Sequence, residues 1–594
     1  MIKKIIELIE PGQVKKFISL NLLFILLGFV EIIGVGSIIP FLNSISYSSI
    51  EESDNLTKFL YELIDPSSYK DFLIITGSIV LTMLVLSNFL RALVSWFTSY
   101  FVWENQAKMS IRLLGYILNR PYEVFSKENS ADISKDVLVE TQNFVVGLLL
   151  PVLTIISQVV ICLSILVALF YFDPYVAFLA TGSIFLVFGI FYTLVHKPLQ
   201  RRGAERFEST NLRFKIVDEA FSGIKLIKLL NKEDYFVDLI KKPSYEFASA
   251  MAFQTFQKRL PRYVFEVIAF GAVVLVALFN IYRGDNISDI ITVIGLFAFA
   301  GYRLLPSISQ IYAAINNLTF NSAVLERLYE QRTLKKLDKL EKKNKNQLTD
   351  LSKLEYSFQN VSYKYGKNEP YVLNKLSLNL VSPKFVSIVG STGSGKSTFI
   401  DLLLGLLSPT EGDIILNKVP LKNISIEELS SLVGYVPQDV YLTDESIMKN
   451  IALGVEEKDI DFKRIIEASR MAEIHELIIE KFDKGYETSV GERGVKLSGG
   501  QVQRIGIARA LYSKASIIIL DEGTSNLDQS TEAKIISNIS KDTKTKLLIM
   551  VAHRLKTTQK CDQIILFNNG SIEDVGSFSE LKERSPTFKL MLNS

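Results

Sequence analysis

The sequence has few cysteines, few histidines and almost no net charge. Cys162 and Cys561 are the only cysteines among 594 residues, and two isolated thiols exclude a disulfide framework or a cysteine-rich metal cluster. The 66 basic residues nearly balance the 63 acidic ones, which leaves a formal net charge of +3. Such a small charge does not indicate a nucleic-acid partner, and we expect none.

Apolar residues are abundant instead, and they are concentrated in the first 325 residues. The chain is 48% hydrophobic with a mean hydropathy of +0.24. About 20 apolar residues suffice to cross a bilayer. The first apolar run is long and has no signal-peptidase site, so we expect it to remain as an anchor. The runs predict six transmembrane helices, at about 17–42, 72–104, 144–170, 174–196, 262–283 and 287–318.

The last two runs are the weaker ones, because Glu266 and Arg303 interrupt them. A buried pair of soluble helices is the alternative there. The distribution of charge favours membrane helices: loops 105–143 and 197–259 carry 18 Lys and Arg residues, and the segments of the opposite side carry three. The positive-inside rule therefore places the long loops and both termini in the cytoplasm, beneath a cytoplasmic (inner) membrane.

This pattern predicts the domain organisation. Residues 1–325 are expected to form an α-helical membrane domain, whose helices continue through the long loops well beyond the bilayer because apolar residues keep a three- and four-residue spacing there. Residues 326–352 are a charged linker with little to bury. Residues 353–594 are expected to form a soluble domain.

A glycine-rich turn in the second half predicts a phosphate site. The stretch "FVSIVGSTGSGKSTFI" reads as a strand, a turn and a helix. Backbone amides of such a turn wrap phosphates, Lys396 would bridge the β- and γ-phosphates, and Ser397 would ligate Mg²⁺. A merely flexible turn is the alternative, disfavoured by the flanking strand and helix. The nucleotide-binding residues are Gly390, Ser391, Thr392, Gly393, Ser394, Gly395, Lys396, Ser397 and Thr398.

Two carboxylates end a later strand. The stretch "ASIIILDE" is apolar up to Asp521 and Glu522. Asp521 would hold Mg²⁺ through water, and Glu522 would polarise the water that attacks the γ-phosphate. The strand end alone means little, but together with the phosphate turn it predicts an α/β P-loop ATPase domain.

A second turn, "KLSGGQVQRI", could also hold an anion, because it exposes backbone amides where a helix begins. With the phosphate turn and the strand end, it makes the chain resemble one half of an exporter-type ABC transporter. The resemblance implies that the α/β ATPase domain includes a helical subdomain. In that family this turn binds the ATP held by the P-loop of the other subunit. The resemblance therefore implies a homodimer with two shared ATP sites, although a heterodimer remains possible. The residues of this turn are Ser498, Gly499, Gly500 and Gln501.

The resemblance also implies roles for single residues. Tyr365 would stack on adenine, with Tyr363 as a competitor for that role. Gln438 in "VGYVPQD" would sense Mg²⁺ and the membrane domain, and His553 in "VAHRL" would contact the γ-phosphate. With Glu522, these two residues make up the expected catalytic set.

Ionisable residues in or beside the predicted spans suggest what is carried. Charges there are expensive and usually face a cavity or a partner. Arg91, Arg262 and Arg303, doubled by a dimer, would make a positive cavity suited to phosphate or pyrophosphate more than to a cationic drug. Snorkelling, or structural pairing with Glu31 or Glu266, is the alternative.

Three further stretches resemble the PglK-type flippases of lipid-linked oligosaccharides: "GFVEIIGVGSIIPFL", "LNRPYEVFSKENSADISKDVLVET" and "GIKLIKLLNKEDYF". The resemblance implies ATP-driven flipping of a polyprenyl-pyrophosphate glycan to the outer leaflet, for protein glycosylation. A flippase of another lipid or glycolipid, such as a lipid A precursor, and a multidrug exporter are the alternatives.

The external segment "DNLTKFLYELIDP" predicts a short amphipathic helix, with Asp54 as its cap and Asp65-Pro66 as its end. Its apolar stripe could pack on the protein's own spans, or lie in the outer leaflet and contact the lipid tail. PglK-type flippases have a short external helix at this position, which favours the second interpretation. The stripe residues singled out for substrate are Leu56, Phe59, Leu60 and Leu63.

Overall fold

A computed structural model of the chain divides into two compact units. The helical unit contains residues 1–120 and 127–341, and the sheet unit contains residues 121–126 and 342–594. The division falls within 326–352, the segment expected to be a linker. The structure describes all residues except 10, 47–54, 126–129, 173, 284–286, 330–352, 367, 383, 543–546, 553–554 and 594.

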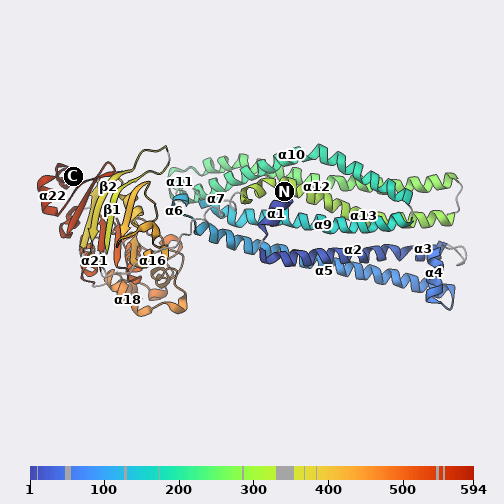
Figure 1. Ribbon diagram of the computed structural model, residues 1–594, viewed down its shortest axis with the longest axis horizontal. Helices are drawn as coiled ribbons and strands as arrows, with labels where there is room; N and C mark the ends of the chain where they lie inside the picture. The colour runs from blue at the N-terminus through green and yellow to red at the C-terminus, as the bar shows by residue number, and fades with distance from the viewer. Residues whose placement is uncertain are drawn as a thin grey trace. The chain divides into compact units, whose positions relative to one another are not determined.

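The helical unit is built from long helices that run side by side (Figure 1). Its helices are α1 (Ile2–Leu8), η1 (Pro11–Gln13), α2 (Val14–Gly36), α3 (Ile38–Ser46), α4 (Asn55–Ile64), α5 (Tyr69–Leu118), α7 (Ser130–Lys135), η3 (Asp136–Glu140), α8 (Thr141–Phe144), η4 (Val145–Leu149), α9 (Leu150–Phe172), α10 (Pro174–Ser222), α11 (Ile224–Leu230), α12 (Glu233–Arg283) and α13 (Ile287–Phe320).

Three of these helices are much longer than a bilayer is thick. Helices α5, α10 and α12 have 50, 49 and 51 residues. At a rise of 1.5 Å per residue each is about 75 Å long, whereas the hydrocarbon core of a bilayer is about 30 Å. A helix of this length that crosses a membrane must extend far outside it, as the spacing in the long loops predicted.

Three helical stretches among the described residues are long and apolar enough to cross a membrane: Val14–Ile45, Tyr69–Leu118 and Asp132–Tyr171. They include the first three predicted spans. The other three predicted spans lie in α10, α12 and α13. The structure makes these segments helical, and their crossing of the membrane stays a prediction.

Local irregularities interrupt the regular helices. Helix α2 ends at Gly36 and α3 begins at Ile38, inside the first predicted span. Two π-helical turns, η3 and η4, precede α9. A π-turn inserts an extra residue and so rotates the following side chains about the helix axis. Phe144 and Leu148, which belong to this region, are fully buried in the core of the unit.

Helices α10 and α13 approach each other closely at Gly203. A Cβ atom at this position would lie 2.1 Å from the carbonyl oxygen of Phe320 and 2.9 Å from its carbonyl carbon. Because these atoms are backbone, they cannot move aside as a flexible side chain could. Glycine is therefore needed at this contact between the two helices.

The sheet unit contains two sheets (Figure 1). A four-stranded antiparallel sheet has the order β2-β1-β4-β5, and a six-stranded sheet has the order β10-β9-β3-β8-β7-β6. Strands β6, β7, β8, β3 and β9 are parallel, and β10 is an antiparallel edge. The strands are β1 (Glu355–Tyr363), β2 (Leu373–Val381), β3 (Lys384–Gly390), β4 (Glu411–Leu416), β5 (Val419–Pro420), β6 (Val433–Val436), β7 (Ile517–Asp521), β8 (Leu547–Val551), β9 (Gln563–Asn568) and β10 (Ser571–Gly576).

Helices complete the sheet unit and separate its strands along the chain. The central strands β7 and β8 are apolar and buried along nearly their whole length, as in parallel sheets covered on both faces. The helices are α6 (Tyr122–Phe125), α15 (Lys396–Leu403), α16 (Ile426–Leu432), α17 (Ile447–Ile451), α18 (Phe462–Met471), α19 (His475–Lys481), α20 (Gly499–Tyr512), α21 (Gln529–Lys541), α22 (Phe578–Arg584) and α23 (Pro586–Asn593).

Replacing Gly203 should destabilise the helical unit. We expect Gly203→Ala to lower stability by about 1–3 kcal/mol, since overpacking forces the backbone to shift. Gly189→Ala is the matched control on the same helix, because a Cβ atom there meets nothing within 4 Å. Thermal unfolding of the purified protein measures both. Equal midpoints for the two variants would contradict the close approach of α10 and α13.

Candidate functional site

The turn between β3 and α15 forms a cradle of backbone groups. Gly393 and Gly395 have φ angles of +79° and +99°, a region that glycine adopts without strain. The Nζ atom of Lys396 donates hydrogen bonds to the carbonyl oxygens of Gly390 and Ser391, each at 2.8 Å. Its ammonium group therefore lies against the turn that it follows, where a phosphate would meet both amides and a positive charge.

Two carboxylates lie close to this cradle. Asp521 ends β7 and accepts a hydrogen bond from the Tyr435 hydroxyl at 3.2 Å. Burial raises the pKa of Asp521, and neighbouring Glu522 raises it further. Burial lowers the pKa of Lys396, whereas the charges of Glu522 and Asp521 raise it. Lys396, Asp521 and Glu522 thus interact electrostatically. They lie at the carboxyl edge of the parallel strands, where ligands bind in α/β folds.

Glu522 adopts an unusual backbone conformation. Its φ angle is +52°, which is rare and costly for a residue with a side chain. The strain lies at the residue expected to act on water. A hard divalent cation fits this donor set, since Asp521 supplies a partly buried carboxylate and Ser397 an exposed hydroxyl.

The structure distinguishes between the two tyrosines proposed to stack on adenine. Tyr363 is 3% exposed and belongs to the core. Tyr365 is half-buried, and its hydroxyl forms a 3.1 Å hydrogen bond with Oγ1 of Thr398 in α15. The two rings meet edge to face, with centroids 5.1 Å apart. Only Tyr365 presents an accessible ring beside the phosphate turn.

The second glycine turn is built as a helix N-terminus. The Ser498 hydroxyl accepts a hydrogen bond from the amide of Gln501 at 3.4 Å, and the Gln501 side chain accepts one from the amide of Ser498 at 2.8 Å. This capping box leaves the hydroxyl hydrogen of Ser498 available for an acceptor. A Cβ atom at Gly500 would lie 3.1 Å from the carbonyl oxygen of Asn526, a tighter contact than is usual, which favours glycine at this position.

The remaining predicted residues of this unit are placed as follows. Ser391, Thr392 and Gly393 are exposed, whereas Ser394 is buried; Gly499 and Gln438 are exposed. His553 lies outside the described residues. Among the described residues, no hydrogen bond or ion pair joins the phosphate turn 390–398 to the signature turn 498–501.

The helical unit holds a buried ion cluster. Glu31 of α2 is 1% exposed. Arg303 of α13 contacts both its carboxylate oxygens, at 2.9 and 3.2 Å, and donates a further hydrogen bond to the Ser87 hydroxyl at 3.2 Å. Nε of Arg91, from α5, lies 2.8 Å from Oε1 of the same carboxylate. Two arginines therefore share one glutamate, which leaves a net positive charge.

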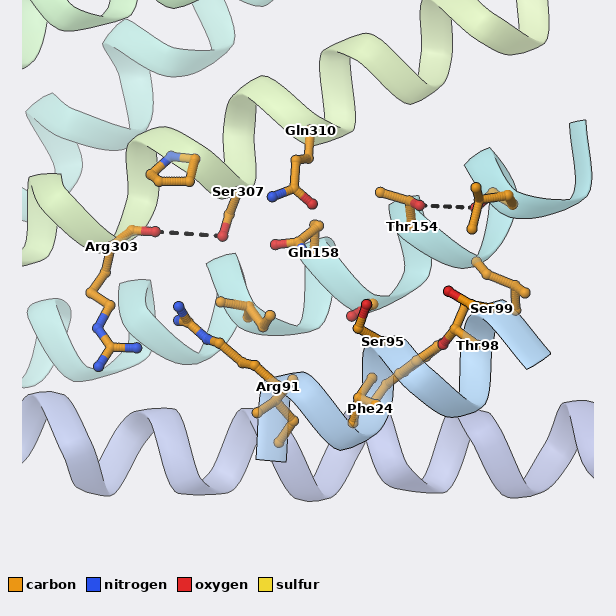
Figure 2. A pocket seen from close by; sticks show the side chains of 17 residues that line it. Phe24, Arg91, Ser95, Thr98, Ser99, Thr154, Gln158, Arg303, Ser307 and Gln310 are labelled. Atoms are coloured by element: carbon orange, nitrogen blue, oxygen red, sulfur yellow. Dashed lines mark hydrogen bonds between the residues drawn. The ribbon is translucent and has the colours of Figure 1, made fainter. Parts of the chain in front are cut away.

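Both arginines line a cavity of about 300 Å³. Its walls come from α2, α5, α9 and α13, and Figure 2 shows the side chains that line it. Much of the wall is neutral and polar, which is unusual inside an apolar helical unit. The polar residues include Ser95, Thr98, Ser99, Thr154, Gln158 and Gln310.

Arg262 is not part of this cluster. It is exposed, and its Nε donates to Oε1 of Glu266 at 2.8 Å, one turn along the same helix. The structure thus brings two of the three predicted arginines together and leaves the third in a local pair.

Helix α4 exposes apolar residues on its surface. Thr57 is fully buried, whereas Phe59 and Leu63 are 59% and 70% exposed; Leu60 is half-buried. Tyr61 packs edge to face on Phe72, with centroids 5.0 Å apart. The helix confirms the predicted element and its end at Ile64. The proposed cap Asp54 and the Leu56 side chain lie outside what the structure describes.

Two residues with clear contacts escaped sequence analysis. Tyr435 binds Asp521. Gln503 joins the signature helix to the next loop, because its side chain bonds to the Ser525 hydroxyl at 2.9 Å and to the amide of Asn526 at 2.9 Å. These pairings are tertiary, and the only available signal was the closeness of Tyr435 to Gln438 in one motif.

Comparison with known proteins identifies both parts of the chain. Residues 17–304 match the family described as the ABC transporter transmembrane region, and residues 373–525 match the family described as ABC transporter. The solved structure of a bacterial Atm1-family ABC exporter with ATP bound has the same fold: its TM-score is 0.77, at 19% identity, over 98% of this chain and 99% of that chain.

Several curated relatives share sequence with the chain. The ABC transporter ATP-binding protein YfiB of Bacillus subtilis is 41% identical over 40% of this chain, and the match spans 40% of that relative's length. The putative multidrug export ATP-binding/permease protein YgaD of the same species is 28% identical over 86% of this chain and 88% of its own. The ATP-dependent lipid A-core flippase of Cupriavidus metallidurans is 26% identical over 80% of this chain and 79% of its own length.

The predicted fold class is thus confirmed. A helical membrane region precedes an α/β nucleotide-binding domain on one chain, and the second domain carries the phosphate cradle and its carboxylates. The chain belongs to the ABC transporters, as an exporter-type half-transporter in which one multi-pass transmembrane region is fused to one ATP-hydrolysing domain.

Proposed function

We propose that two copies of this chain form a homodimer that flips a lipid-linked oligosaccharide, a polyprenyl-pyrophosphate glycan, from the inner to the outer leaflet of the cytoplasmic membrane. The glycan would serve protein glycosylation, and the nucleotide-binding domain would lie in the cytoplasm. The observation that carries the proposal is the polar, net-positive cavity inside the helical unit. A phosphate-linked sugar headgroup has the charge and the hydroxyl groups that such a wall can bind.

The same cavity bears on the alternatives. Relatives named lipid A-core flippases support a flippase of another phosphorylated glycolipid as the second candidate, because its headgroup has the same chemistry. A relative named for multidrug export supports a third. An apolar or cationic drug fits poorly beside Arg91 and a wall of hydroxyl and amide groups, since drug sites are mostly apolar and aromatic.

The nucleotide site supports hydrolysis by the residues of this chain. Lys396 and the amides of the turn would hold the phosphates, and Tyr365 the adenine. Ser397 and Asp521, with Gln438, would hold Mg²⁺, which when bound neutralises charge on the phosphates. Glu522 would orient the attacking water, and His553 would contact the γ-phosphate. Glu522 interacts with Lys396 and Asp521, which supports this assignment.

Homodimerisation follows from the two separate anion-binding turns. Ser498 caps its own helix and keeps one hydrogen to donate, yet no hydrogen bond links its turn to the phosphate turn among the described residues. Each ATP would then be held between the phosphate turn of one copy and the signature turn of the other. Both turns are intact, which favours identical copies.

Helix α4 supports a lipid substrate. Its exposed Phe59 and Leu63 lie one turn apart on one face. An amphipathic helix with a free apolar face lies in a membrane interface, and in the outer leaflet this face would contact the polyprenyl tail. We expect Phe59→Ser combined with Leu63→Ser to impair flipping at unchanged basal ATPase activity, with Glu62→Ser as the control. Normal flipping by the double variant would show that α4 only packs on the protein and does not contact the lipid tail.

Liposome reconstitution tests the function itself. Fluorescent lipid-linked glycan is placed in both leaflets, and the fraction open to a membrane-impermeant quencher is followed. We expect ATP to change this fraction with the wild-type protein and to leave it unchanged with Glu522→Gln. An ATPase-active protein that moves no lipid-linked glycan would overturn the proposed substrate.

Removal of the water-orienting carboxylate should stop turnover while nucleotide binding persists. For Glu522→Gln we expect ATP hydrolysis to fall by at least about a hundredfold, a typical loss for a general base. Binding of a fluorescent ATP analogue serves as the control for folding. Hydrolysis near the wild-type rate would assign the base to another residue.

Mixed dimers test the shared sites. Lys396→Ala damages the phosphate turn in one copy, and Ser498→Arg blocks the signature turn in the other. The mixed dimer then keeps one intact composite site, whereas each homodimeric variant has none. We expect hydrolysis only in the mixed dimer, at up to about half the wild-type rate because one of two sites remains. A mixed dimer as inactive as both parents would refute sharing.

A further inference from the structure

The cavity of the helical unit has a wall that is more polar than packing of the helices requires. Hydroxyl and amide side chains come to it from α5, α9 and α13, and the volume is about 300 Å³ (Figure 2). Small and polar residues are common where membrane helices pack and hydrogen-bond to each other, but these side chains line an open volume. Figure 2 shows Arg91 and Arg303 toward one end of the cavity, with Ser95, Thr98 and Ser99 further along α5.

The hydroxyl of Thr98 is unusual within this wall. Other threonines of the long helices, such as Thr76, Thr82 and Thr154, donate to the carbonyl oxygen one turn earlier, at 2.8 to 2.9 Å. Thr98 is only 9% exposed, and among the described residues its Oγ1 has no hydrogen-bond partner. A buried hydroxyl left without a partner costs about 1–3 kcal/mol. A polar ligand in the cavity would remove this cost.

The groups around Thr98 match a sugar ring. Gln158 of α9 and Gln310 of α13 each carry an amide that both donates and accepts, as the hydroxyl groups of a sugar require. A phospholipid headgroup such as phosphoglycerol would use the arginine but offers fewer hydroxyl groups to these amides.

The arginine pair sets where the phosphate goes. Arg303 uses both terminal nitrogens on Glu31 and Ser87. Arg91 reaches Glu31 through Nε, and among the described residues no partner occupies its two terminal nitrogens. The side chain of Arg91 is also 32% exposed, against 3% for Arg303. Arg91 can therefore offer a bidentate fork to a phosphate at the end of the cavity.

We propose that this cavity, within a single protomer, is the subsite for the one sugar that carries the phosphate. Thr98, Gln158 and Gln310 bind its hydroxyl groups, and Arg91 binds the adjoining phosphate. A volume at the lower limit of ligand pockets, which span about 300–1,000 Å³, accepts a monosaccharide and excludes the rest of an oligosaccharide. The assignment rests on the proposed function, and it adds which part of the glycan the protein recognises.

Two variants separate sugar from phosphate. Thr98→Val and Gln158→Leu remove polar groups and nearly conserve volume, and Thr82→Val, whose hydroxyl bonds to Ser78 on the same helix, is the control. The readout is the concentration of lipid that half-maximally stimulates ATP hydrolysis. The two lipids compared are polyprenyl pyrophosphate with one hexose and polyprenyl pyrophosphate alone.

For the double variant Thr98→Val with Gln158→Leu, we expect the half-maximal concentration of the hexose lipid to rise by about tenfold or more. The half-maximal concentration of the sugar-free lipid should stay unchanged. Thr82→Val should match the wild type for both. Thr98→Val alone should keep or raise the thermal midpoint, because it removes an unpartnered buried hydroxyl. An equal shift for both lipids, or none for the hexose lipid, overturns the sugar subsite.

A second measurement is independent of transport. Ser95 lines the cavity and is exposed, whereas the native thiols Cys162 and Cys561 are buried. Ser95→Cys therefore reports access when it reacts with a water-soluble alkylating reagent, with the wild-type protein as background. We expect a hexose 1-phosphate to protect it at lower concentration than inorganic phosphate or glycerol 3-phosphate.

Equal protection by the three anions refutes sugar recognition even where flipping is intact. Conversely, wild-type protein that responds to neither lipid while the hexose phosphate still protects Ser95→Cys refutes the flippase proposal and keeps the subsite. The two failures are thus distinguishable.

Discussion

The Glu31 carboxylate, buried among helices and held between two guanidinium groups, constrains the helical unit. Burying a charge is tolerated only when it is paired and hydrogen-bonded. Arg303 meets both oxygens of this carboxylate, and Arg91 meets one from another helix. The cluster therefore ties α2, α5 and α13 to one register. Any rearrangement of these helices must keep Glu31 paired, since removing one partner of a buried pair costs about 3–5 kcal/mol.

Within this cluster, two arginines that look equivalent in the sequence have different roles. Arg303 is committed to Glu31 and Ser87, so its role is to hold the helices. Arg91 keeps its terminal nitrogens toward the cavity and gives that cavity its charge. A single glutamate thus leaves a net charge of one sign beside a wall of neutral polar groups. That combination suits a phosphate joined to a sugar better than a free multivalent anion.

The structure of the nucleotide-binding half was largely predictable because its functional residues lie in short, contiguous motifs. The phosphate turn, the strand that ends in Asp521 and the capped turn at Ser498 are local structures, and their geometry follows from nearby residues. The end of α4 at Ile64 was predictable for the same reason. In the helical unit, the i,i+4 spacing of Arg262 and Glu266 already allowed the local pair that the structure contains.

What the sequence could not give depends on contacts between distant segments. Glu31 and Arg303 are far apart along the chain, and the choice of Arg303 over Arg262 as its partner is decided by helix packing. The break at Ser37 and the π-turns η3 and η4 shift the register of side chains without a change in apolar spacing. The unpartnered hydroxyl of Thr98 becomes visible only once the neighbouring helices are in place.

The division between Arg303 as a holding group and Arg91 as a ligand group is the central claim. Thermal unfolding with and without lipid-linked glycan tests it, because a ligand that binds the folded state raises the midpoint. The account predicts that Arg91→Ala lowers the midpoint of the free protein less than Arg303→Ala does, because Arg303 still contacts both oxygens of Glu31, and that it loses the rise caused by the glycolipid. Arg303→Ala should lower the midpoint of the free protein. A full ligand-induced rise in Arg91→Ala would contradict the account.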